Sequence, residues 1–320
     1  MNRHAVVLML AALAACAGEP VTAQSYPNKS IRMIIPAPPG GAVDTVGRAV
    51  AQKLAVALGQ PVVADNRPGA GTVIAAELTA KAPPDGHTFL MVTNSHAITA
   101  SVQKNLPYDP VHDFSPVALL SVSPYLLVVH PAVPAKSVRE LVALARQRPG
   151  QLHFASAGSS SATHLAGELF KSLARINLVH VPYKGGSPAA ADLVGGHVEM
   201  MFNNLISVIG LVKAGRLRAL AVTSARRLPV VPDLPTVAEA GVPGYEDASW
   251  VGALLPAGTP LPIVDILNRE LVKAIQAPEV RDRLVSEGVE VVGSTAAAFA
   301  QYLTKDIERW RKLAPSLAIQ

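Results

Sequence analysis

The chain repeats one local pattern: a short apolar stretch, a loop of Gly, Pro or Ser, and then apolar residues at helical spacing. In the first instance, a mostly apolar stretch at 31–36 runs into the sequence Pro-Pro-Gly-Gly at 38–41. Two prolines cannot donate hydrogen bonds to a neighbouring strand and two glycines permit a sharp turn, so we expect the strand to end there. From 43 to 57 apolar residues recur at steps of three and four, which predicts an amphipathic helix whose first turn faces the loop.

The same pattern predicts further elements along the chain. We expect strands at 61–65, 88–93, 152–155 and 178–183, and a helix from about 72 to 81. The strand at 152–155 leads into a loop rich in serine and glycine and then into another helical pattern. Strands that alternate with helices indicate an α/β protein with mostly parallel sheets flanked by helices.

Two apolar strands bounded by prolines are typical of crossings between two lobes. The first covers 125–130, between Pro124 and Pro131, and the second covers 250–255 and precedes Pro256. If they pair as hinge strands, the middle of the chain forms one lobe, its two ends form the other, and a cleft lies between them. The expected boundaries are 25–124 plus 249–320 for lobe 1 and 125–248 for lobe 2.

The composition supports two folded domains and excludes several classes of protein. The chain has 320 residues and a mass of 33.4 kDa, with 50% hydrophobic and 16% charged residues, which excludes a disordered chain. Its formal charge of +5 comes from Lys and Arg scattered along the chain, so nucleic acid is not an expected partner. Cys16 is the single cysteine and the histidines lie singly, so we expect no disulfide, no metal and no cofactor.

The first 24 residues are typical of a targeting segment. Arg3 supplies a positive start, residues 5–15 form an apolar run, and Ala23 closes a small-x-small cleavage motif. The run of 11 residues is shorter than the length of about 20 that a membrane span needs. We therefore expect a signal peptide at 1–23 and a periplasmic protein. Cys16 ends a Leu-Ala-Ala-Cys sequence that resembles a lipobox, so it is either a lipid anchor or discarded with the signal peptide.

Two glycine-containing loops that run into helices are candidate anion sites. A helix N-terminus carries unpaired N–H groups and about half a positive charge. The loops at 40–41 and 158–161 lie on opposite sides of the first expected crossing, and both follow the carboxyl ends of strands, where α/β proteins bind ligands. A small carboxylate held between the two lobes fits this arrangement.

Single residues near these loops each have a functional and a structural interpretation. Asp44, in the first helical turn, either stabilises the helix N-terminus, orders the loop or meets an ammonium group of a ligand. Asn203, after the apolar stretch at 198–202, either reads a ligand or forms a turn. Arg48 and Lys184 are the cations nearest to two of the loops, and we interpret both as solvated.

Three other motifs are interpreted as structural. The sequence Gly-Ala-Gly at 69–71 resembles the start of a dinucleotide fingerprint, but Ile74 occupies the position of the third glycine. Ser161 and His164 suggest a serine nucleophile with its base, yet their spacing does not aim the imidazole at the hydroxyl, and we expect a helix cap instead. His164 and Glu168 lie one turn apart without the further ligands that a metal needs.

Several motifs together resemble one family. They are Pro-x-Pro-Pro-Gly-Gly-x-x-Asp-x-x-x-Arg at 36–48, Leu-Pro-Tyr-Asp at 106–109, Val-Pro-Tyr-Lys-Gly at 181–185, Lys-Ala-Gly-Arg-Leu-Arg-Ala-Leu-Ala-Val-Thr at 213–223 and Asp-Leu-Pro-Thr at 233–236. In this order, and over nearly the whole chain after the signal segment, the sequence resembles the Bordetella uptake gene family. These proteins are the extracytoplasmic solute receptors of tripartite tricarboxylate transporters.

The resemblance implies a two-lobed, type II periplasmic-binding-protein fold that closes on a small organic acid. Carried over by position, the loops at 37–44 and 156–163 hold the ligand's carboxylate through backbone N–H groups, hydroxyls and bridging waters, and the other walls read the rest of the ligand. The candidate ligand-binding residues are Ala37, Gly40, Gly41, Ala42, Asp44, Ser95, Ser156, Gly158, Ser159, Ser161, Thr163 and Asn203, with Tyr183 beside them.

Three positions depart from the family pattern. Ala37 stands in place of a bulky aromatic residue, Ser160 in place of a common glycine, and Asn203 in place of a frequent aspartate. Ala37 widens the expected pocket floor, and Asn203 lacks the negative charge that suits an amino group. We therefore expect a dicarboxylate or an aromatic carboxylate as ligand, in preference to an acidic amino acid.

The resulting hypothesis is a monomeric periplasmic receptor, not an enzyme. It binds a small carboxylate by hinge closure and delivers it unchanged to a separate two-subunit membrane permease. Two other functions remain open from the sequence. One is an exported esterase that uses Ser161 with His164, and the other is a ligand receptor for a membrane sensor.

Overall fold

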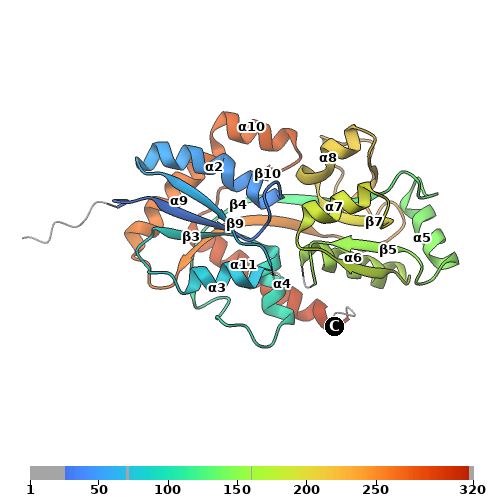
Figure 1. Cartoon of the computed structure of the whole chain (residues 1–320), viewed down its shortest axis with the longest axis horizontal. Helices are drawn as coiled ribbons and strands as arrows, with labels where there is room; N and C mark the ends of the chain where they lie inside the picture. The colour runs from blue at the N-terminus through green and yellow to red at the C-terminus, as the bar shows by residue number, and fades with distance from the viewer. Residues whose placement is uncertain (1–25, 70–71, 160, 317–320) are drawn as a thin grey trace, which may run out of the picture.

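The computed structural model describes residues 26–69, 72–159 and 161–316. The expected signal peptide, Cys16, part of the Gly-Ala-Gly motif and Ser160 lie outside the described residues. Figure 1 shows two lobes side by side, one made of the N-terminal and C-terminal elements and the other of the green and yellow middle of the chain. Within the described ranges, none of the helices combines the length and apolar character that a bilayer crossing needs.

The first lobe is built on five strands in the spatial order β2-β1-β3-β9-β4. Their bounds are Ile31–Ile35 for β1, Val62–Asn66 for β2, Thr88–Thr93 for β3, Phe114–Val129 for β4 and Ala248–Pro256 for β9. β1 is parallel to β2 and β3, whereas β9 is antiparallel to β3 and β4. A short strand, β10 (Glu290–Val291), pairs with β4.

The second lobe continues the sheet from β4 in the order β4-β7-β5-β6, and β8 also pairs with β4. The bounds are His153–Ser156 for β5, Val179–Pro182 for β6, Met200–Asn204 for β7 and Arg218–Val222 for β8. β5 is parallel to β6 and β7, whereas β4 is antiparallel to β7 and β8. The predicted α/β architecture is confirmed, and the sheet is mixed because the long strands β4 and β9 run against their neighbours.

The sheet changes partners within β4. Its register with β9 ends at the pair Pro124–Ala248, and its register with β7 begins at the pair Tyr125–Asn204. The stretch expected as a separate crossing strand at 125–130 is thus the second half of one 16-residue strand. The stretch expected at 250–255 belongs to β9, whose pairings among the described residues are with β3 and the first half of β4.

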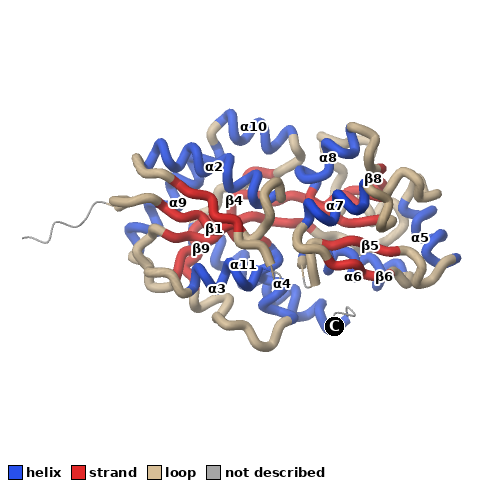
Figure 2. Tube along the Cα trace, viewed as in Figure 1, coloured by secondary structure: helices blue, strands red, loops and turns tan. Residues whose placement is uncertain are grey.

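Helices cover both faces of the sheet (Figure 2). In the first lobe they are α2 (Ala42–Leu58), α3 (Val73–Ala80), α4 (Asn94–Val102), α9 (Leu261–Gln276), α10 (Pro278–Ser286) and α11 (Ala296–Leu313), followed by the 3-10 helix η2 (Ala314–Ser316). In the second lobe they are α5 (Val138–Gln147), α6 (Ala162–Ala174), α7 (Gly186–Val194) and α8 (Leu205–Lys213). The helix predicted from apolar spacing at 43–57 is α2, which buries Val43, Val46, Val50 and Leu54.

The C-terminal helix α11 packs against α4 and β4, next to the place where the sheet changes partners. It buries Phe299, Leu303, Ile307 and Trp310 at helical spacing. Burying such side chains contributes about 1.5–3 kcal/mol each, so α11 is an integral part of the first lobe. This placement brings the polar residues of α11 close to the crossing.

Candidate functional site

A cavity of about 340 Å³ lies between the two lobes. Nine of the twelve predicted ligand-binding residues line it: Ala37, Gly41, Ala42, Ser95, Gly158, Ser159, Ser161, Thr163 and Asn203. The other three, Gly40, Asp44 and Ser156, do not line the cavity, and they form hydrogen bonds within the two loops. The structure thus brings both predicted loops to one cavity from opposite lobes.

The first loop is held by the carboxylate of Asp44. Its oxygens accept hydrogen bonds from the backbone N–H of Gly40 at 2.9 Å, from Nε of Arg48 at 3.0 Å and from Nδ2 of Asn66 at 2.8 Å. Burial by itself raises the pKa of Asp44, but these bonds outweigh it and hold the pKa below its ordinary value. Asp44 is therefore an internal support of the loop whose charge is already paired with Arg48.

The backbone of this loop faces the cavity at the start of α2. Gly41 is the N-cap residue, and no side chain caps the helix. Gly40 has a φ of +81°, a conformation that favours glycine. A Cβ atom on Gly41 would lie 3.4 Å from the Ala37 Cβ and from the Pro38 carbonyl oxygen. The small residues therefore leave the helix N-terminus open to the cavity.

The second loop is folded by its own hydroxyl groups. Ser156 Oγ accepts a hydrogen bond of 3.1 Å from the N–H of Gly158, and Thr163 Oγ1 accepts one of 2.8 Å from the N–H of Ala157. Gly158 has a φ of +133°, and a Cβ atom there would lie 3.1 Å from the carbonyl oxygen of Tyr183. A side chain at Gly158 would therefore be strained by the positive φ and would press against the Tyr183 carbonyl.

Ser161 is the N-cap residue of α6, which confirms the prediction that it caps a helix. Its Oγ accepts a hydrogen bond of 3.3 Å from the backbone N–H of His164. The imidazole Nε2 of His164 lies 3.7 Å from Glu168 Oε1, and the ring stacks on His180 with 3.8 Å between centroids. Burial raises the pKa of Glu168, but the neighbouring His164 and the hydrogen bond from Lys171 outweigh it and lower the pKa overall.

The imidazole of His180 continues this polar cluster toward the second loop. Its Nε2 lies 2.6 Å from Ser156 Oγ. Burial, and next the neighbouring His164, lower the pKa of His180 to about 4, so the ring is neutral at physiological pH. The cluster supports the loop from behind. Within the described ranges, no three His, Cys, Asp or Glu side chains are grouped as metal ligands.

The two lobes touch each other directly beside the cavity. Ser95 Oγ, in the first turn of α4, accepts a hydrogen bond of 3.2 Å from the N–H of Ala162 in the first turn of α6. Gly185 lies so close to Pro38 that a Cβ atom on the glycine would be 2.6 Å from the proline Cγ. The described conformation is therefore one in which the loops of both lobes are in contact.

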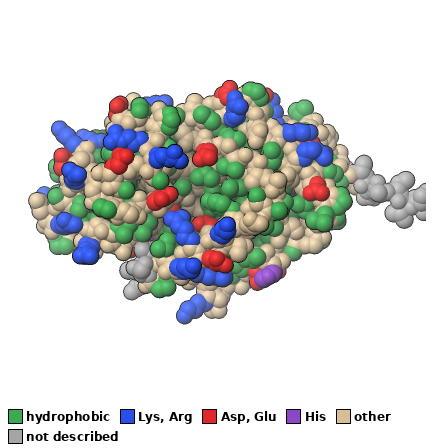
Figure 3. All heavy atoms as spheres, turned by 180° about the vertical axis from the view of Figure 1, so that it is seen from behind, with side chains coloured by type: hydrophobic (Ala, Val, Ile, Leu, Met, Phe, Trp, Pro, Cys, Tyr) green, Lys and Arg blue, Asp and Glu red, His purple; other side chains and the backbone are tan. Residues whose placement is uncertain are grey.

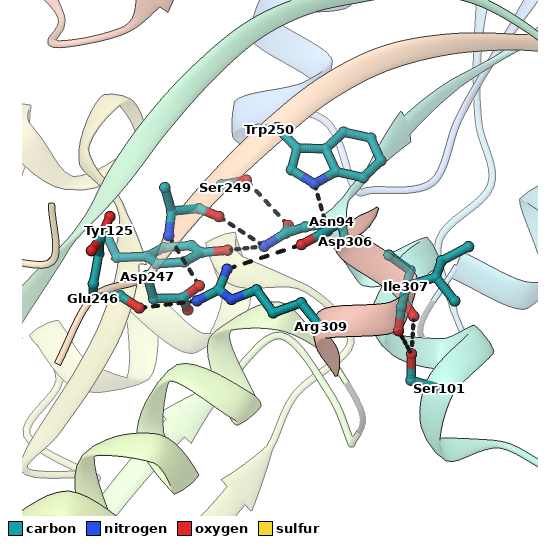
Figure 4. A network of polar contacts seen from close by, with 12 residues as sticks. Asn94, Ser101, Tyr125, Glu246, Asp247, Ser249, Trp250, Asp306, Ile307 and Arg309 are labelled. Carbon is teal, nitrogen blue, oxygen red and sulfur yellow. Dashed lines mark hydrogen bonds and ion pairs between the residues drawn. The ribbon is translucent and has the colours of Figure 1, made fainter. Parts of the chain in front are cut away.

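A polar wall of the cavity was not found from the sequence. Asn94 Nδ2 donates hydrogen bonds to the Tyr125 hydroxyl at 2.9 Å and to the Ala248 carbonyl at 3.2 Å, and Ser249 Oγ donates to Asn94 Oδ1 at 3.4 Å (Figure 4). Asn94, Tyr125 and Ser249 all line the cavity. Their sequence signal was indirect: Asn94 precedes the predicted Ser95, and the other two lie at the expected crossings.

Thr72 was also missed. It lines the cavity, is buried, and precedes α3 as its N-cap residue. Its φ is +88°, which a β-branched residue adopts at a cost of about 1–3 kcal/mol. A backbone held in this conformation against that cost is typical of ligand sites. No motif in the sequence indicated it.

Lys184 is the single ionised side chain among the described residues that line the cavity. Its side chain is exposed, as predicted, but the structure places it at the cavity instead of on remote surface. On the face of the molecule shown in Figure 3, basic and acidic side chains are interspersed. The ionised side chain at the cavity is therefore positively charged.

The chain is similar to one protein family over most of its length. A family described as "Tripartite tricarboxylate transporter family receptor" matches residues 46–319. Protein BugT of Bordetella pertussis is 36% identical over 314 residues, covering 97% of this chain and 96% of that protein. A UPF0065 protein in the tcbD-tcbE intergenic region of Pseudomonas sp. is 42% identical over 290 residues, covering 90% of this chain and 86% of that protein.

Solved structures share the fold. Rpa4515 of R. palustris with adipate superposes with a TM-score of 0.88 at 38% identity, covering 91% of this chain and 98% of that one. MatC of Rhodopseudomonas palustris with bound malate superposes with a TM-score of 0.86 at 34% identity, covering 90% and 99%. The periplasmic binding protein BugD superposes with a TM-score of 0.88 at 32% identity, covering 92% and 99%.

Proposed function

We propose that this chain, which belongs to the tripartite tricarboxylate transporter receptor family, captures a small organic carboxylate between its lobes and delivers it unchanged to a membrane permease. Members of this family are periplasmic solute-binding proteins. The ligand, the residues that hold it and the permease are the parts of the proposal that go beyond family membership.

One observation carries the proposal. Two helix N-termini, of α2 and α6, open toward the same cavity from opposite lobes, and Lys184 supplies a positive charge beside them. Each N-terminus carries a partial positive charge, which favours an anion. The first turn of α2 has no side-chain cap, whereas in α6 the N–H groups of Ala162 and His164 are bonded to serine hydroxyls, so α6 contributes mainly its partial charge. Hydroxyls of Ser95 and Thr163 add polar groups that suit carboxylate oxygens.

Binding by hinge closure follows from the way the chain connects the lobes. We assign residues 25–124 and 249–320 to lobe 1 and residues 125–248 to lobe 2, because β4 changes sheet partners at 124–125 and β9 begins at Ala248. A ligand that contacts both loops at once stabilises the closed arrangement, and a ligand that contacts only one does not. The Ser95–Ala162 hydrogen bond supports this arrangement as the closed state.

A dicarboxylate is the ligand class that the site supports best. Asn203 lines the cavity, and its neutral side-chain amide is hydrogen-bonded within the protein. Its Nδ2 donates to the Gly186 carbonyl, and its Oδ1 accepts from the N–H of Asn204. It therefore brings no negative charge that would bind an amino group. The similar structures with adipate and malate hold dicarboxylates, and we extend that ligand class to this chain.

The proposal also covers how the protein is exported and which membrane protein receives its ligand. A signal peptide at 1–23 would deliver the chain to the periplasm as a monomer, with Cys16 either lipidated or removed. A separate two-subunit permease would receive the ligand, and a membrane sensor is the alternative partner. The polar partners of His164 and Ser161 support a structural role for both, against the esterase hypothesis.

A binding panel tests the function. Isothermal titration calorimetry with adipate, malate, citrate, benzoate and glutamate should show binding of at least one dicarboxylate, and at about 100 times its Kd that ligand should add about 2.7 kcal/mol to the unfolding free energy. Failure of every carboxylate to bind would refute the proposal. Hydrolysis of a chromogenic ester that is lost in Ser161→Ala would favour the esterase instead.

A further inference from the structure

Asp247 lies where the chain crosses from lobe 2 back to lobe 1, directly before β9. Its side chain is buried, with 1% of the residue exposed. Its N–H donates to the Thr223 carbonyl at 3.0 Å, and its Oδ1 accepts from the N–H of Ala248 at 3.0 Å. Its other oxygen, Oδ2, has no hydrogen-bond partner within the described residues. A buried carboxylate with one unsatisfied oxygen is costly when ionised.

The positively charged group that acts on Asp247 is Arg309, whose hydrogen bond and ion pair are with other residues. Arg309 of α11 donates from one terminal nitrogen to the Glu246 carbonyl at 3.1 Å, and its other lies 4.0 Å from Asp306 (Figure 4). Asp306 is itself buried and accepts a hydrogen bond of 2.8 Å from Trp250 Nε1. Arg309 therefore divides its charge between two buried carboxyl groups.

The groups that face Asp247 come from three parts of the chain. They are Tyr125 of β4, Tyr245 and Glu246 of the crossing segment, and Tyr302, Asp306 and Arg309 of α11. Burial is the main cause that raises the pKa of Asp247, to about 7; Arg309 lowers it, and Asp306 and Glu246 raise it further. Asp247 therefore changes charge near neutral pH.

Asp247 is in electrostatic contact with the cavity wall. Ser249, two residues further along the extended strand, lines the cavity, and so does Tyr125. Burial, and next the charge of Asp247, raise the pKa of the Tyr125 phenol. Asn94 bonds to both the Tyr125 hydroxyl and the Ala248 carbonyl, and so joins the wall to the crossing. A charge in the cavity and a charge on Asp247 therefore act on the same polar groups.

We propose that Asp247 is a proton-binding site coupled to the ligand site: the receptor takes up a proton there when an organic anion enters the cavity, and it binds the anion more tightly with Asp247 protonated. This step rests on the proposed function, because the coupling requires an anionic ligand. Two negative charges separated by a weakly hydrated wall repel each other. The bound anion therefore disfavours ionisation of Asp247, and an ionised Asp247 disfavours binding of the anion. Thermodynamic reciprocity then makes affinity depend on pH.

The sign and size of the coupling follow from the same argument. The bound anion raises the pKa of Asp247, so affinity is highest where the carboxyl is protonated and falls as the pH rises through about 7. It levels off once Asp247 is ionised in both free and bound protein. The span from Asp247 to Ser249 is about 7 Å of extended strand, and a ligand charge lies beyond Ser249. At a separation of about 12 Å and an effective dielectric constant of about 20, the difference between the two plateaus is on the order of tenfold in Kd.

Calorimetry tests the coupling on the full mature chain. We would measure the Kd of adipate and malate from roughly pH 6 to 9, above the ordinary pKa of carboxyl groups, in buffers with different ionisation enthalpies. Wild type should bind more weakly as the pH rises and take up a fraction of a proton near pH 7. Asp247→Asn should bind with a Kd that does not depend on pH and with no proton uptake near pH 7.

Glu246→Gln is the matched control. It removes the same charge one residue away, from an exposed side chain. It should retain both the pH dependence and the proton uptake, at a slightly lower pH because the Glu246 charge raises the pKa of Asp247. Wild type with a pH-independent Kd, or Asp247→Asn that still takes up a proton, would overturn the inference. Wild type that binds no carboxylate at any pH would instead refute the proposed function.

The proton site is also tested without a ligand. Because burial raises the pKa of Asp247 in the folded state to about 7, the folded protein holds a proton there that the unfolded chain has already lost above about pH 4, so the folded state loses stability as the pH rises from about 4 to about 7. The Tm of wild type should therefore fall relative to that of Asp247→Asn between roughly pH 4 and 7, and the Tm difference should stay constant above that range. A Tm difference that is the same at every pH would show that Asp247 is not the group that titrates. Asp247→Ser repeats the comparison if the Asn variant does not fold.

Discussion

The hydroxyl of Ser95 and the backbone N–H of Ala162 form a 3.2 Å hydrogen bond that joins the first turn of α4 to the first turn of α6. The bond spans the two lobes at the edge of the cavity, and Ser95 still has a hydroxyl proton to donate. A ligand oxygen in the cavity is a suitable acceptor for that proton. Ser95 thereby connects lobe closure with ligand binding.

Ser95→Ala should weaken binding of adipate or malate about fivefold, because one net hydrogen bond contributes about 1 kcal/mol. The unfolding free energy in the absence of ligand should change little. The control is Ser101→Ala, on the same helix, whose hydroxyl donates to Ala97 and Ile307 within lobe 1. An equal loss of affinity in both variants, measured by calorimetry, would show that Ser95 acts only through the stability of α4.

Gly158→Val should reduce carboxylate affinity by more than about 100-fold while the chain still folds. Valine does not readily adopt the φ of +133°, and its Cβ would press on the Tyr183 carbonyl at 3.1 Å. The loop would have to move, and its N–H groups with it. Gly210→Val is the control, because nothing lies within 4 Å of a Cβ there. Unchanged calorimetric affinity in Gly158→Val would remove the second loop from the binding site.

Lys184→Gln should weaken binding of a dicarboxylate more than binding of a monocarboxylate of equal length. Lys184 is exposed, so the expected effect on adipate is about threefold, and it should shrink with added salt, whereas hexanoate should be affected less. Lys213→Gln, at an exposed position on α8, controls for net charge. Equal effects on adipate and hexanoate would indicate general attraction of anions instead of recognition of a second carboxylate.

Asp44→Asn should destabilise the protein by about 1–3 kcal/mol at neutral pH, because the buried carboxylate accepts bonds from Gly40, Arg48 and Asn66. The folded-state pKa of Asp44 is lowered. Its contribution is therefore present above the ordinary aspartate pKa of about 4 and is lost as the pH falls below it.

Urea unfolding at neutral and acidic pH measures this effect. The difference between wild type and Asp44→Asn should shrink in acid as the wild-type carboxyl is protonated. Asp282→Asn removes an exposed carboxylate paired with Arg281 on the surface and should change the unfolding free energy by less than about 1 kcal/mol. A difference for Asp44→Asn that persists unchanged in acid would show that its charge is not what stabilises the loop.

Local features of the chain were sufficient to predict much of this arrangement. Apolar spacing predicted α2, and the serine at the start of a helical pattern predicted the cap of α6, because both depend on residues within one or two turns. The two loops were predictable for the same reason, since glycine, proline and serine determine backbone geometry locally.

Contacts between distant segments were beyond such reasoning. The wall of Asn94, Tyr125 and Ser249 joins residues up to 155 positions apart. The raised pKa of Asp247 arises from its burial at the crossing segment, beside β4 and α11, which are far apart in the sequence. The spacing of residues along the sequence does not predict which side chains become buried, nor that Arg309 acts on both Asp247 and Asp306. Those properties arise only when the sheet, the crossing segment and α11 pack together, because desolvation and Coulomb interactions depend on distance in space and not along the chain.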